Sequence, residues 1–337
     1  MKKKLVKRTD VDRSQQLRLA FQLAFLALNV WIGMQFYAWV RFVETNGATR
    51  AATRPSGVEG WLPIAGLMNL KAFIVTGSVP RVHSAGMFLL IAFLTMSLLM
   101  KKAFCSWLCP VGTISEWLWR IFRIRGRIPR WLDIPLRSLK YLLLGFFGWA
   151  IARMSADEIA QFMQSPYGLI ADVKMLNFFR FIGTTGLIVL GVIVALSVVI
   201  ENFWCRYLCP YGALLGLTAL LSPARIRRDA DACIDCAKCA KVCPARLPVD
   251  KKPQILSAEC TLCMQCTAVC PAARALEVRV TKRRPVPAWA VAATIAAIFF
   301  GVTAFARLSG HWNLRVPMEI YKTLVANASN VSHPMPR

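Results

Sequence analysis

Eight cysteines between residues 222 and 285 repeat one spacing twice. The pattern C-x2-C-x2-C-x3-C-P occurs at Cys233–Pro244 and again at Cys260–Pro271. A tight loop with this spacing can bring three thiolates to three corners of one [4Fe–4S] cubane, while the fourth cysteine reaches a neighbouring cubane. The sequence therefore predicts two clusters with crossed ligands. Cluster 1 is expected on Cys233, Cys236, Cys239 and Cys270, and cluster 2 on Cys243, Cys260, Cys263 and Cys266.

Structural zinc and disulfides are the competing explanations for these eight cysteines. Zinc sites favour two C-x2-C pairs with a longer spacer between them, and disulfides are disfavoured in a reducing compartment. Segment 222–285 also has few large apolar residues, so crossed ligation would help to hold its two halves together. We therefore expect a small α+β domain of the bacterial 2[4Fe–4S] ferredoxin type at residues 222–285.

The remaining four cysteines belong to a second repeat. Cys105–Gly112 and Cys205–Gly212 both read C-x3-C-P-x-G and lie 100 residues apart. The proline is expected to end one helix and the glycine to allow a tight turn into the next, an apolar helix at 113–122 or 213–221. Two thiols cannot ligate a cubane alone, but two pairs can. A third iron–sulfur centre is therefore one hypothesis for Cys105, Cys109, Cys205 and Cys209; redox thiols, a copper site and helix-end packing are the alternatives.

Long apolar stretches indicate a membrane protein. The mean hydropathy is +0.48 and only 18% of the residues are charged, which argues against a wholly soluble chain. Stretches long enough to cross the hydrocarbon core lie near residues 20–40, 84–100, 139–154, 181–200 and 286–306. Segment 58–78 is interrupted by Pro63 and Gly66 and is expected to be interfacial or re-entrant. We expect an all-α polytopic membrane protein with about five transmembrane helices and two repeated hairpins, related by a pseudo-two-fold axis along the membrane normal.

The basic residues predict the orientation. Of the 42 Lys and Arg residues, 30 lie in segments that would share one side of the membrane, and 12 lie on the other side. The positive-inside rule makes the basic side cytoplasmic. The expected order is a basic cytoplasmic N-terminus (1–18), a membrane domain (19–221), a cytoplasmic ferredoxin domain (222–285), a fifth transmembrane helix (286–306) and a periplasmic tail (307–337). This accounts for the net charge of +25 without nucleic acid as a partner, since no nucleic-acid-binding motif accompanies it.

The three histidines argue against several bis-histidine haems. His83, His311 and His333 all fall on the predicted outer side. An interfacial or loop histidine is the ordinary explanation for each. His83 directly precedes a predicted span and is also a candidate for binding a quinone head group.

In order and spacing, the two C-x3-C-P-x-G motifs followed by the double run of Cys233–Pro244 and Cys260–Pro271 resemble the NapH/NosR/CcoG group of membrane polyferredoxins. They look most like NapH and the YccM-type electron-transport proteins, and the resemblance covers residues 20–285. It implies a protein of the bacterial inner membrane that passes electrons between the quinone pool and partner redox proteins of a respiratory chain. The chain would then be an electron carrier or a quinol dehydrogenase subunit. Its partners would be a periplasmic cytochrome c or reductase, or a cytoplasmic ferredoxin or flavodoxin.

The residues themselves also favour electron transfer. Iron–sulfur clusters do one-electron chemistry, and no nucleotide-binding glycine motif, catalytic triad or flavin motif accompanies them here. Basic residues of the ferredoxin segment could steer an acidic soluble donor; they are Arg225, Arg227, Arg228, Lys238, Lys241, Lys251 and Lys252. Two other functions stay open, namely an assembly or metal-reduction factor for a respiratory enzyme and a redox-sensing membrane regulator.

Overall fold

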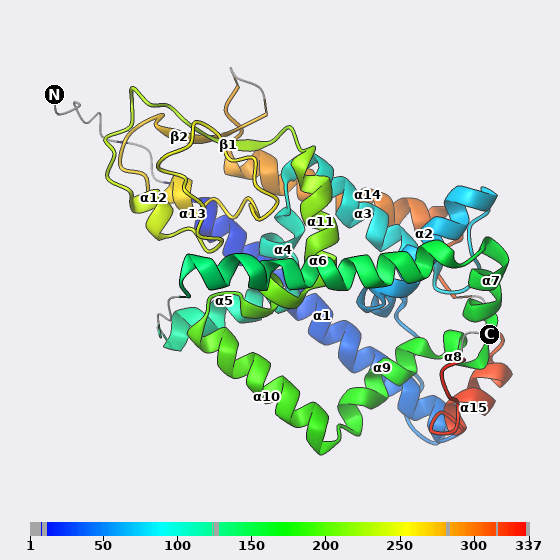
Figure 1. The fold of residues 1–337 in the computed structure, drawn as a ribbon. Coiled ribbons are helices and arrows are strands. Elements are labelled where there is room, and N and C mark those ends of the chain that lie inside the picture. The colour runs from blue at the N-terminus through cyan, green and yellow to red at the C-terminus, as the bar shows by residue number, and fades with distance from the viewer. Residues whose placement is uncertain are drawn as a thin grey trace. The chain divides into compact units, whose positions relative to one another are not determined.

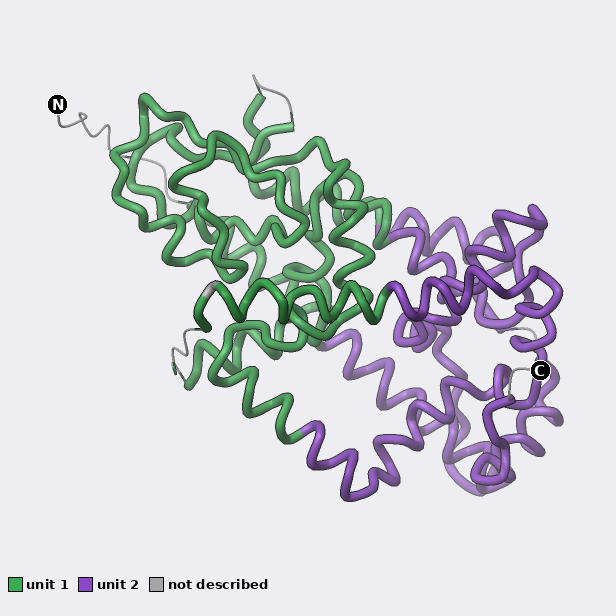
Figure 2. The backbone as a smooth tube through the Cα atoms, viewed as in Figure 1, with its two compact units in different colours: residues 1–26, 93–144, 191–298 green, residues 27–92, 145–190, 299–337 purple. Residues whose placement is uncertain are grey.

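The computed structural model describes residues 8, 12–122, 124, 128–280, 284–314 and 316–334. Much of the basic N-terminal segment 1–18 thus lies outside the described residues. The chain forms two compact units (Figure 2). Unit 1 contains residues 1–26, 93–144 and 191–298, and unit 2 contains residues 27–92, 145–190 and 299–337. All twelve cysteines belong to unit 1 and all three histidines to unit 2.

The structure is mostly helical, as expected (Figure 1). The first half of the chain contains α1 (Ser14–Glu44), the 3-10 helix η1 (Ser56–Trp61), α2 (Pro63–Thr76), α3 (Ser84–Met100), α4 (Ala103–Trp107), α5 (Pro110–Phe122) and α6 (Arg130–Arg153). The second half contains α7 (Ala156–Gln164), α8 (Pro166–Leu169), α9 (Ala171–Arg180), α10 (Thr184–Val199), the π-helix η2 (Trp204–Leu208), α11 (Pro210–Leu220), β1 (Arg225–Arg228), α12 (Lys238–Lys241), α13 (Gln265–Ala268), β2 (Leu276–Arg279), α14 (Ala288–Leu308) and α15 (Met318–Ala326).

Helices form at all five stretches expected to cross the membrane. Among the described residues, three helices are long and apolar enough to cross it by themselves: α1, residues 131–153 of α6, and α14. α3 has only 17 residues, which is short for a hydrocarbon core of about 30 Å. Large apolar side chains such as Leu142 and Phe146 on α6 are exposed, as expected for a helix that contacts lipid. The chain is a helical membrane protein, and the count of five spans stays a prediction.

The fourth expected span, residues 181–200, is part of a bent pair of helices. α9 and α10 meet at an angle of 84° at a short break, and α10 itself has 16 residues. The break comprises residues 181–183, between Arg180 at the end of α9 and Thr184 at the start of α10. If α9 and α10 together form one span, the described residues contain four.

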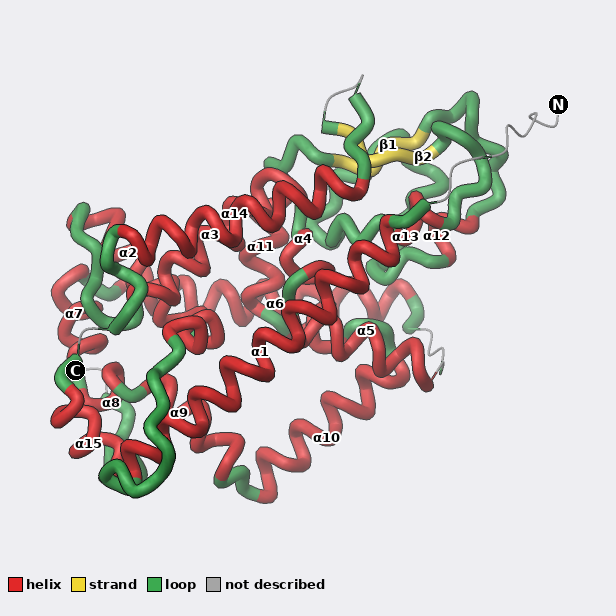
Figure 3. The backbone as a smooth tube through the Cα atoms, turned by 180° about the vertical axis from the view of Figure 1, so that it is seen from behind, coloured by secondary structure: helices red, strands yellow, loops and turns green. Residues whose placement is uncertain are grey.

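The cysteine-rich segment of unit 1 contains the two strands (Figure 3). β1 and β2 pair antiparallel, with Arg225 opposite Arg279 and Ile226 opposite Val278. Ile226 and Val278 are buried and form the apolar face of this ladder. Because β1 precedes both cysteine runs and β2 follows them, the ladder joins the two ends of the segment. With α12 and α13, the segment contains both helices and strands within unit 1, and its boundaries as a separate domain stay a prediction.

Unit 2 has an apolar core of its own. α1, α9 and α15 contribute side chains to it, including Trp39 and Tyr321, whose rings meet edge to face at 5.3 Å. α2 begins with Pro63 in its first turn and ends at Gly77, which adopts a φ of 69°. A proline at the start and a left-handed glycine just past the end are the usual boundaries of a helix. Pro63 therefore divides segment 58–78 as expected, whereas Gly66 lies within α2 and does not interrupt it.

Candidate iron–sulfur centres

The two cysteine loops share a backbone shape. In the first loop, Asp235 and Ala237 on either side of the middle cysteine both have a φ of 56°. In the second loop, the equivalent residues Leu262 and Met264 have φ values of 49° and 59°. A left-handed conformation costs a non-glycine residue about 1–2 kcal/mol. Left-handed residues at the same two positions of both loops therefore indicate that the loop shape is under a functional constraint. α12 and α13 follow the two loops immediately.

Electrostatic interactions divide the eight thiols of these loops into two groups. Cys270 interacts with Cys233 and Cys236, and Cys239 interacts with Cys270 and Cys233. We call these four the set-1 cysteines. The set-2 cysteines are the other four, and within this set Cys266 interacts most with Cys263, then with Cys260 and Cys243, and least with a set-1 thiol, Cys239.

The two sets differ in their access to solvent. Cys236 is exposed, and the set-1 cysteines line an open pocket together with Arg228, Lys238 and Asp250. In set 2, Cys260 is 8% exposed and Cys266 is 7% exposed. Set 1 is therefore the one that a soluble partner could approach closely.

The C-x3-C-P motifs place their cysteines at the junction between two helices. Cys105 lies in α4 and Cys205 in the π-helix η2, whereas Cys109 and Cys209 directly precede α5 and α11. The prolines Pro110 and Pro210 are the first residues of α5 and α11, so they start the second helix of each pair. The apolar helices expected at 113–122 and 213–221 consequently begin three residues earlier than predicted.

The two motif glycines are not equivalent. A Cβ atom on Gly112 would lie 2.3 Å from the carbonyl oxygen of Cys105, which is far inside van der Waals contact. A Cβ atom on Gly212 would lie 3.6 Å from the Cys209 sulfur, an ordinary contact distance. Both glycines lie in the first turn of a helix, α5 or α11, and not in a separate tight turn as predicted. Only the first motif requires a residue without a Cβ.

The four motif cysteines interact with one another across the repeat. Burial raises the pKa of Cys205, and the thiols of Cys209, Cys109 and Cys105 raise it further because each would be a like charge. Burial likewise raises the pKa of Cys105 to about 12. Redox-active dithiols have lowered pKa values, so these surroundings disfavour that alternative.

The donor set fits iron–sulfur clusters. All twelve cysteines are free thiols, and thiolates are the ligands of such clusters. Among the described residues, no three His, Cys, Asp or Glu side chains are close enough together to hold a single metal ion. A cubane differs from a single ion because it spreads four thiolates over four iron atoms.

Both motifs form hydrogen bonds to the backbone next to set-2 cysteines. The Ser106 hydroxyl donates a hydrogen bond to the carbonyl of Thr261 (2.7 Å), and the Trp107 indole donates to that of Leu262 (3.1 Å). In the other motif, Arg206 donates to the carbonyl of Pro244 at 3.0 Å. Ser106 and Arg206 occupy equivalent positions, directly after the first cysteine of each motif. The repeat therefore contacts set 2 from both of its halves.

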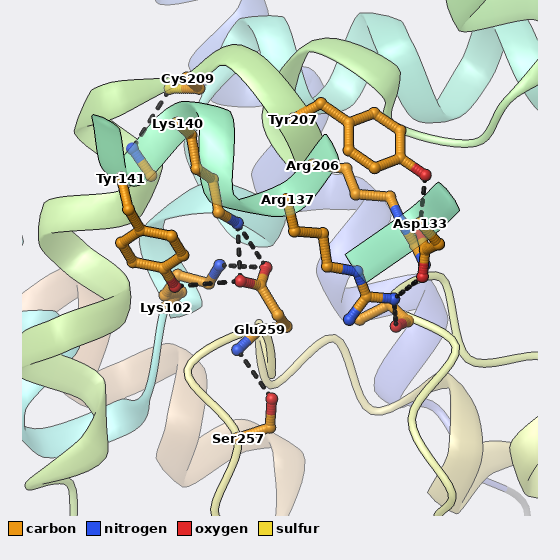
Figure 4. Close-up of polar contacts among 12 residues, drawn as sticks. Lys102, Asp133, Arg137, Lys140, Tyr141, Arg206, Tyr207, Cys209, Ser257 and Glu259 are labelled. Atoms are coloured by element: carbon orange, nitrogen blue, oxygen red, sulfur yellow. Dashed lines mark hydrogen bonds and ion pairs between the residues drawn. The ribbon is translucent and has the colours of Figure 1, made fainter. Parts of the chain in front are cut away.

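Two carboxylates fix this arrangement, and both are shown in Figure 4; Asp133 is buried and Glu259 is partly buried. Asp133 of α6 accepts hydrogen bonds from the Arg206 guanidinium at 2.9 and 2.8 Å and from the Tyr207 hydroxyl at 2.6 Å. It also pairs with Arg137, one turn further along α6. Arg206 is thus held between a carboxylate and the carbonyl of Pro244, which follows the set-2 residue Cys243.

The second carboxylate directly precedes a set-2 cysteine. Glu259 accepts hydrogen bonds from Lys140 at 2.6 and 2.7 Å, from Lys102 at 3.1 Å and from the Tyr141 hydroxyl at 3.1 Å (Figure 4). Burial alone would raise the pKa of Glu259, but the two ammonium groups outweigh burial and hold it below its ordinary value. Glu259 is therefore an anion that links α6 and the first motif to the loop of Cys260.

α1 is fixed to the same region by a third ion pair. Arg18 binds both carboxylate oxygens of Glu116 at 2.8 and 2.7 Å, and both side chains are buried. Gln265 of α13 donates to the same carboxylate at 2.9 Å. The Gln15 amide donates to the carbonyl of Cys263 at 3.0 Å. A helix from the start of the chain thus contacts the second cysteine loop.

His83 lies in a buried ionic cluster of unit 2. Its Nε2 donates to the carbonyl of Gly168 at 2.8 Å, and its Nδ1 lies 3.3 Å from Glu59. Glu59 also pairs with Arg54 at 2.9 Å, and Arg54 pairs with Asp172 at 2.6 Å. Burial lowers the pKa of His83, but the hydrogen bond and ion pair with Glu59 outweigh burial and raise it above its ordinary value. Its Nε2 is hydrogen-bonded, its Nδ1 faces the Glu59 carboxylate, and His83 is completely buried.

The other two histidines of unit 2 lie beside aromatic rings. The ring of His311 is 6.4 Å from that of Phe88, and the ring of His333 is 4.8 Å from that of Tyr167.

Sequence reasoning missed the charged residues that connect the cysteine sets. Lys102, Lys140, Glu259 and Asp133 are separated by up to 157 positions, and spacing does not reveal such pairs. Lys102 and Glu259 stand within three residues of a predicted ligand, but so does the exposed Lys238, so position alone does not single them out.

The basic residues proposed to steer a partner differ in exposure. Lys238, Lys241, Lys251 and Lys252 are exposed, and Lys238 lines the set-1 pocket. The three arginines of β1 are partly buried; Arg228 pairs with Asp235, and Arg225 bonds to the carbonyl of Ser222.

Comparison with known families places iron–sulfur domains on both cysteine regions. A model described as a 4Fe-4S binding domain matches residues 82–129 and again residues 182–228, which contain the two C-x3-C-P motifs. A model described as a 4Fe-4S dicluster domain matches residues 225–271. The same model matching twice agrees with an internal repeat of these motifs.

Three relatives show how far the similarity extends. "Putative electron transport protein YccM" of Escherichia coli is 50% identical over 326 residues, covering 94% of this chain and 91% of that protein. The ferredoxin-type protein NapH of Haemophilus influenzae is 29% identical, covering 71% of this chain and 80% of that protein. The methylamine utilization ferredoxin-type protein MauN of Paracoccus denitrificans is 30% identical, covering 47% and 56%. No solved structure matches the chain.

Proposed function

The chain belongs to the family of the electron transport protein YccM, and from that premise we propose that it carries electrons between the quinone pool and a soluble redox partner. Membership of this family, together with the 4Fe-4S domains, makes it a membrane-bound iron–sulfur protein of electron transport. A bound [4Fe–4S] cluster supplies one-electron oxidation and reduction. The quinone and the partner are the further steps of the proposal.

The proposed ligands are the three groups of four thiols. Set 1 would hold cluster 1 and set 2 would hold cluster 2, with Cys243 and Cys270 crossing between the loops. The grouping of the thiols by their interactions supports these assignments. The four motif cysteines would hold a third iron–sulfur centre, which is supported by the 4Fe-4S domain matched on each motif and by the interaction of Cys205 with the other three thiols.

The proposed order of the cysteine groups is motif, then set 2, then set 1. It depends mainly on one observation: both motifs bond to the backbone beside set-2 cysteines, at Thr261 after Cys260 and at Pro244 after Cys243. Set 1, with its exposed Cys236, would then face the soluble partner. Exposed lysines around set 1 fit an acidic partner such as a ferredoxin or flavodoxin.

Of the 42 Lys and Arg residues, 30 lie in segments on the side of the ferredoxin domain and 12 on the side of the C-terminal tail. This excess supports a cytoplasmic location for the ferredoxin domain and a periplasmic location for the tail. The proposed membrane is the bacterial inner membrane, with five spans and two repeated hairpins. The match of one family model to both motif regions supports the duplication.

Anaerobic iron counting with EPR during a quinol titration tests this function. We expect about twelve iron atoms per chain, and reduction of the centres by menaquinol or ubiquinol in membranes. Cys236→Ala and Cys263→Ala should each remove about four iron atoms, whereas Ser257→Ala, a change beside the second loop, should remove none. About eight iron atoms with normal reduction would refute the third centre. Centres that neither quinol can reduce or reoxidise would refute the quinone connection.

A further inference from the structure

The backbone of Lys102 forms hydrogen bonds to one set-2 cysteine and to one motif cysteine. Its backbone N–H donates to the carbonyl of Cys260 at 3.3 Å. Its own carbonyl accepts a hydrogen bond from the backbone N–H of Cys105 at 3.0 Å. Two hydrogen bonds and one residue thus separate a set-2 cysteine from a motif cysteine.

The side chain of Lys102 is a buried cation between the same two groups. It is 4% exposed, and its Nζ lies 3.1 Å from Glu259. The ammonium group interacts electrostatically with four thiols from both groups: Cys105, Cys205, Cys209 and Cys260. Because burial weakens solvent screening, a charge in this position acts more strongly than one on the surface.

The charge is present on only one half of the repeat. Lys102 lies three residues before Cys105, and the equivalent residue before Cys205 is Asn202. The neighbouring Lys101 is also buried, but its ammonium group bonds to the carbonyl of Ala219 at 3.0 Å and acts on the set-2 thiol Cys260, whereas Lys102 acts on thiols of both groups. The asymmetry makes Lys102 a specific feature of this site and not a consequence of the duplication.

We propose that Lys102, held in place by Glu259, raises the reduction potentials of the centres on the motif cysteines and on set 2. It is a positioning residue, since it acts through the cysteines and touches no iron. The inference rests on the proposed function, in that both groups hold clusters. Reduction adds negative charge to a cluster, and a nearby buried cation stabilises that state.

Four variants test the inference by EPR-monitored redox titration. Lys102→Gln removes the charge and should lower both potentials by about 59 mV, which is a tenfold change in the one-electron equilibrium. Lys102→Arg keeps the charge and should restore most of the loss. Glu259→Gln removes the counter-charge and should shift both potentials the opposite way. Lys238→Gln makes the same chemical change at the exposed set-1 pocket and should leave both potentials unchanged.

The sign of the potential shift in Glu259→Gln distinguishes an electrostatic effect on the reduction potentials from a role in holding the loops together. If Lys102 and Glu259 only held the loops together, both variants would perturb the potentials in the same direction, and that result would overturn the inference. Unchanged potentials in Lys102→Gln would overturn it too. The proposed function is judged separately, from the iron content and quinol response of the wild-type protein, and the set-2 signal alone still tests Lys102 if the third centre is absent.

Discussion

Asp133→Asn should destabilise unit 1 by about 3 kcal/mol, at the lower end of the roughly 3–5 kcal/mol that breaking a buried ion pair costs. Asp133 and Arg206 are 5% and 6% exposed and share two hydrogen bonds of 2.9 and 2.8 Å. Asparagine has nearly the same shape but leaves the guanidinium buried without a counter-charge. The lower end of the range applies because Arg206 keeps its hydrogen bond to the carbonyl of Pro244.

Thermal unfolding of the protein in detergent, followed by tryptophan fluorescence, measures this loss. A change of about 3 kcal/mol corresponds to a fall in Tm of about 4 °C for a chain of 337 residues. Arg137→Gln is the matched control, because Arg137 pairs with the same carboxylate while being 21% exposed, and it should cost below about 1 kcal/mol. Asp133→Leu combined with Arg206→Met should cost less than Asp133→Asn, since neither charge is then left alone. If the Asp133→Asn and Arg137→Gln variants had the same melting temperature, this account would be refuted.

Two further outcomes are expected. Gly112→Ala should destabilise the protein by about 1–3 kcal/mol, because its Cβ would lie 2.3 Å from the Cys105 carbonyl oxygen. The control variant Gly212→Ala should be tolerated. Equal melting temperatures for the two variants would show that the close approach at Gly112 does not affect stability. The pair of His83 and Glu59 should stabilise unit 2 fully below about pH 6.5, the pKa of an unfolded histidine, and this contribution should fade as the pH rises through the higher pKa of the folded state. Melting curves from pH 6 to 9 measure it, and His83→Gln should lose that part of the pH dependence; an identical pH profile in the variant would contradict the reasoning.

The cysteine loops could be anticipated because their ligands are close in sequence. The short spacing in Cys233–Pro244 allows few backbone conformations for the loop. The structure accordingly has left-handed residues at the same positions of both loops. The helical ranges could be anticipated for a similar reason, since apolar runs such as residues 286–306 specify their own helix, found at Ala288–Leu308.

The ends of helices and the ion pairs could not be anticipated in the same way. α6 begins at Arg130 and runs through Pro135, earlier than residues 139–154 suggested. Its first turn contains Asp133, which is held by Arg206 and Tyr207 from elsewhere in the chain. Contacts of this kind depend on tertiary packing, which local propensity does not encode. The bend between α9 and α10 lies at residues 181–183, at the start of the expected span 181–200, and it too depends on tertiary packing.

The unequal exposure of the two loop sets also bears on how the protein would fail in air. Dioxygen and its reduced forms reach solvent-facing sulfur first, and Cys236 is the exposed thiol of its loop. Damage would therefore begin at the outermost centre and spare Cys260 and Cys266, whose surroundings shield them. A molecule injured in this way would keep its fold and its inner cofactors while losing its contact with the aqueous partner.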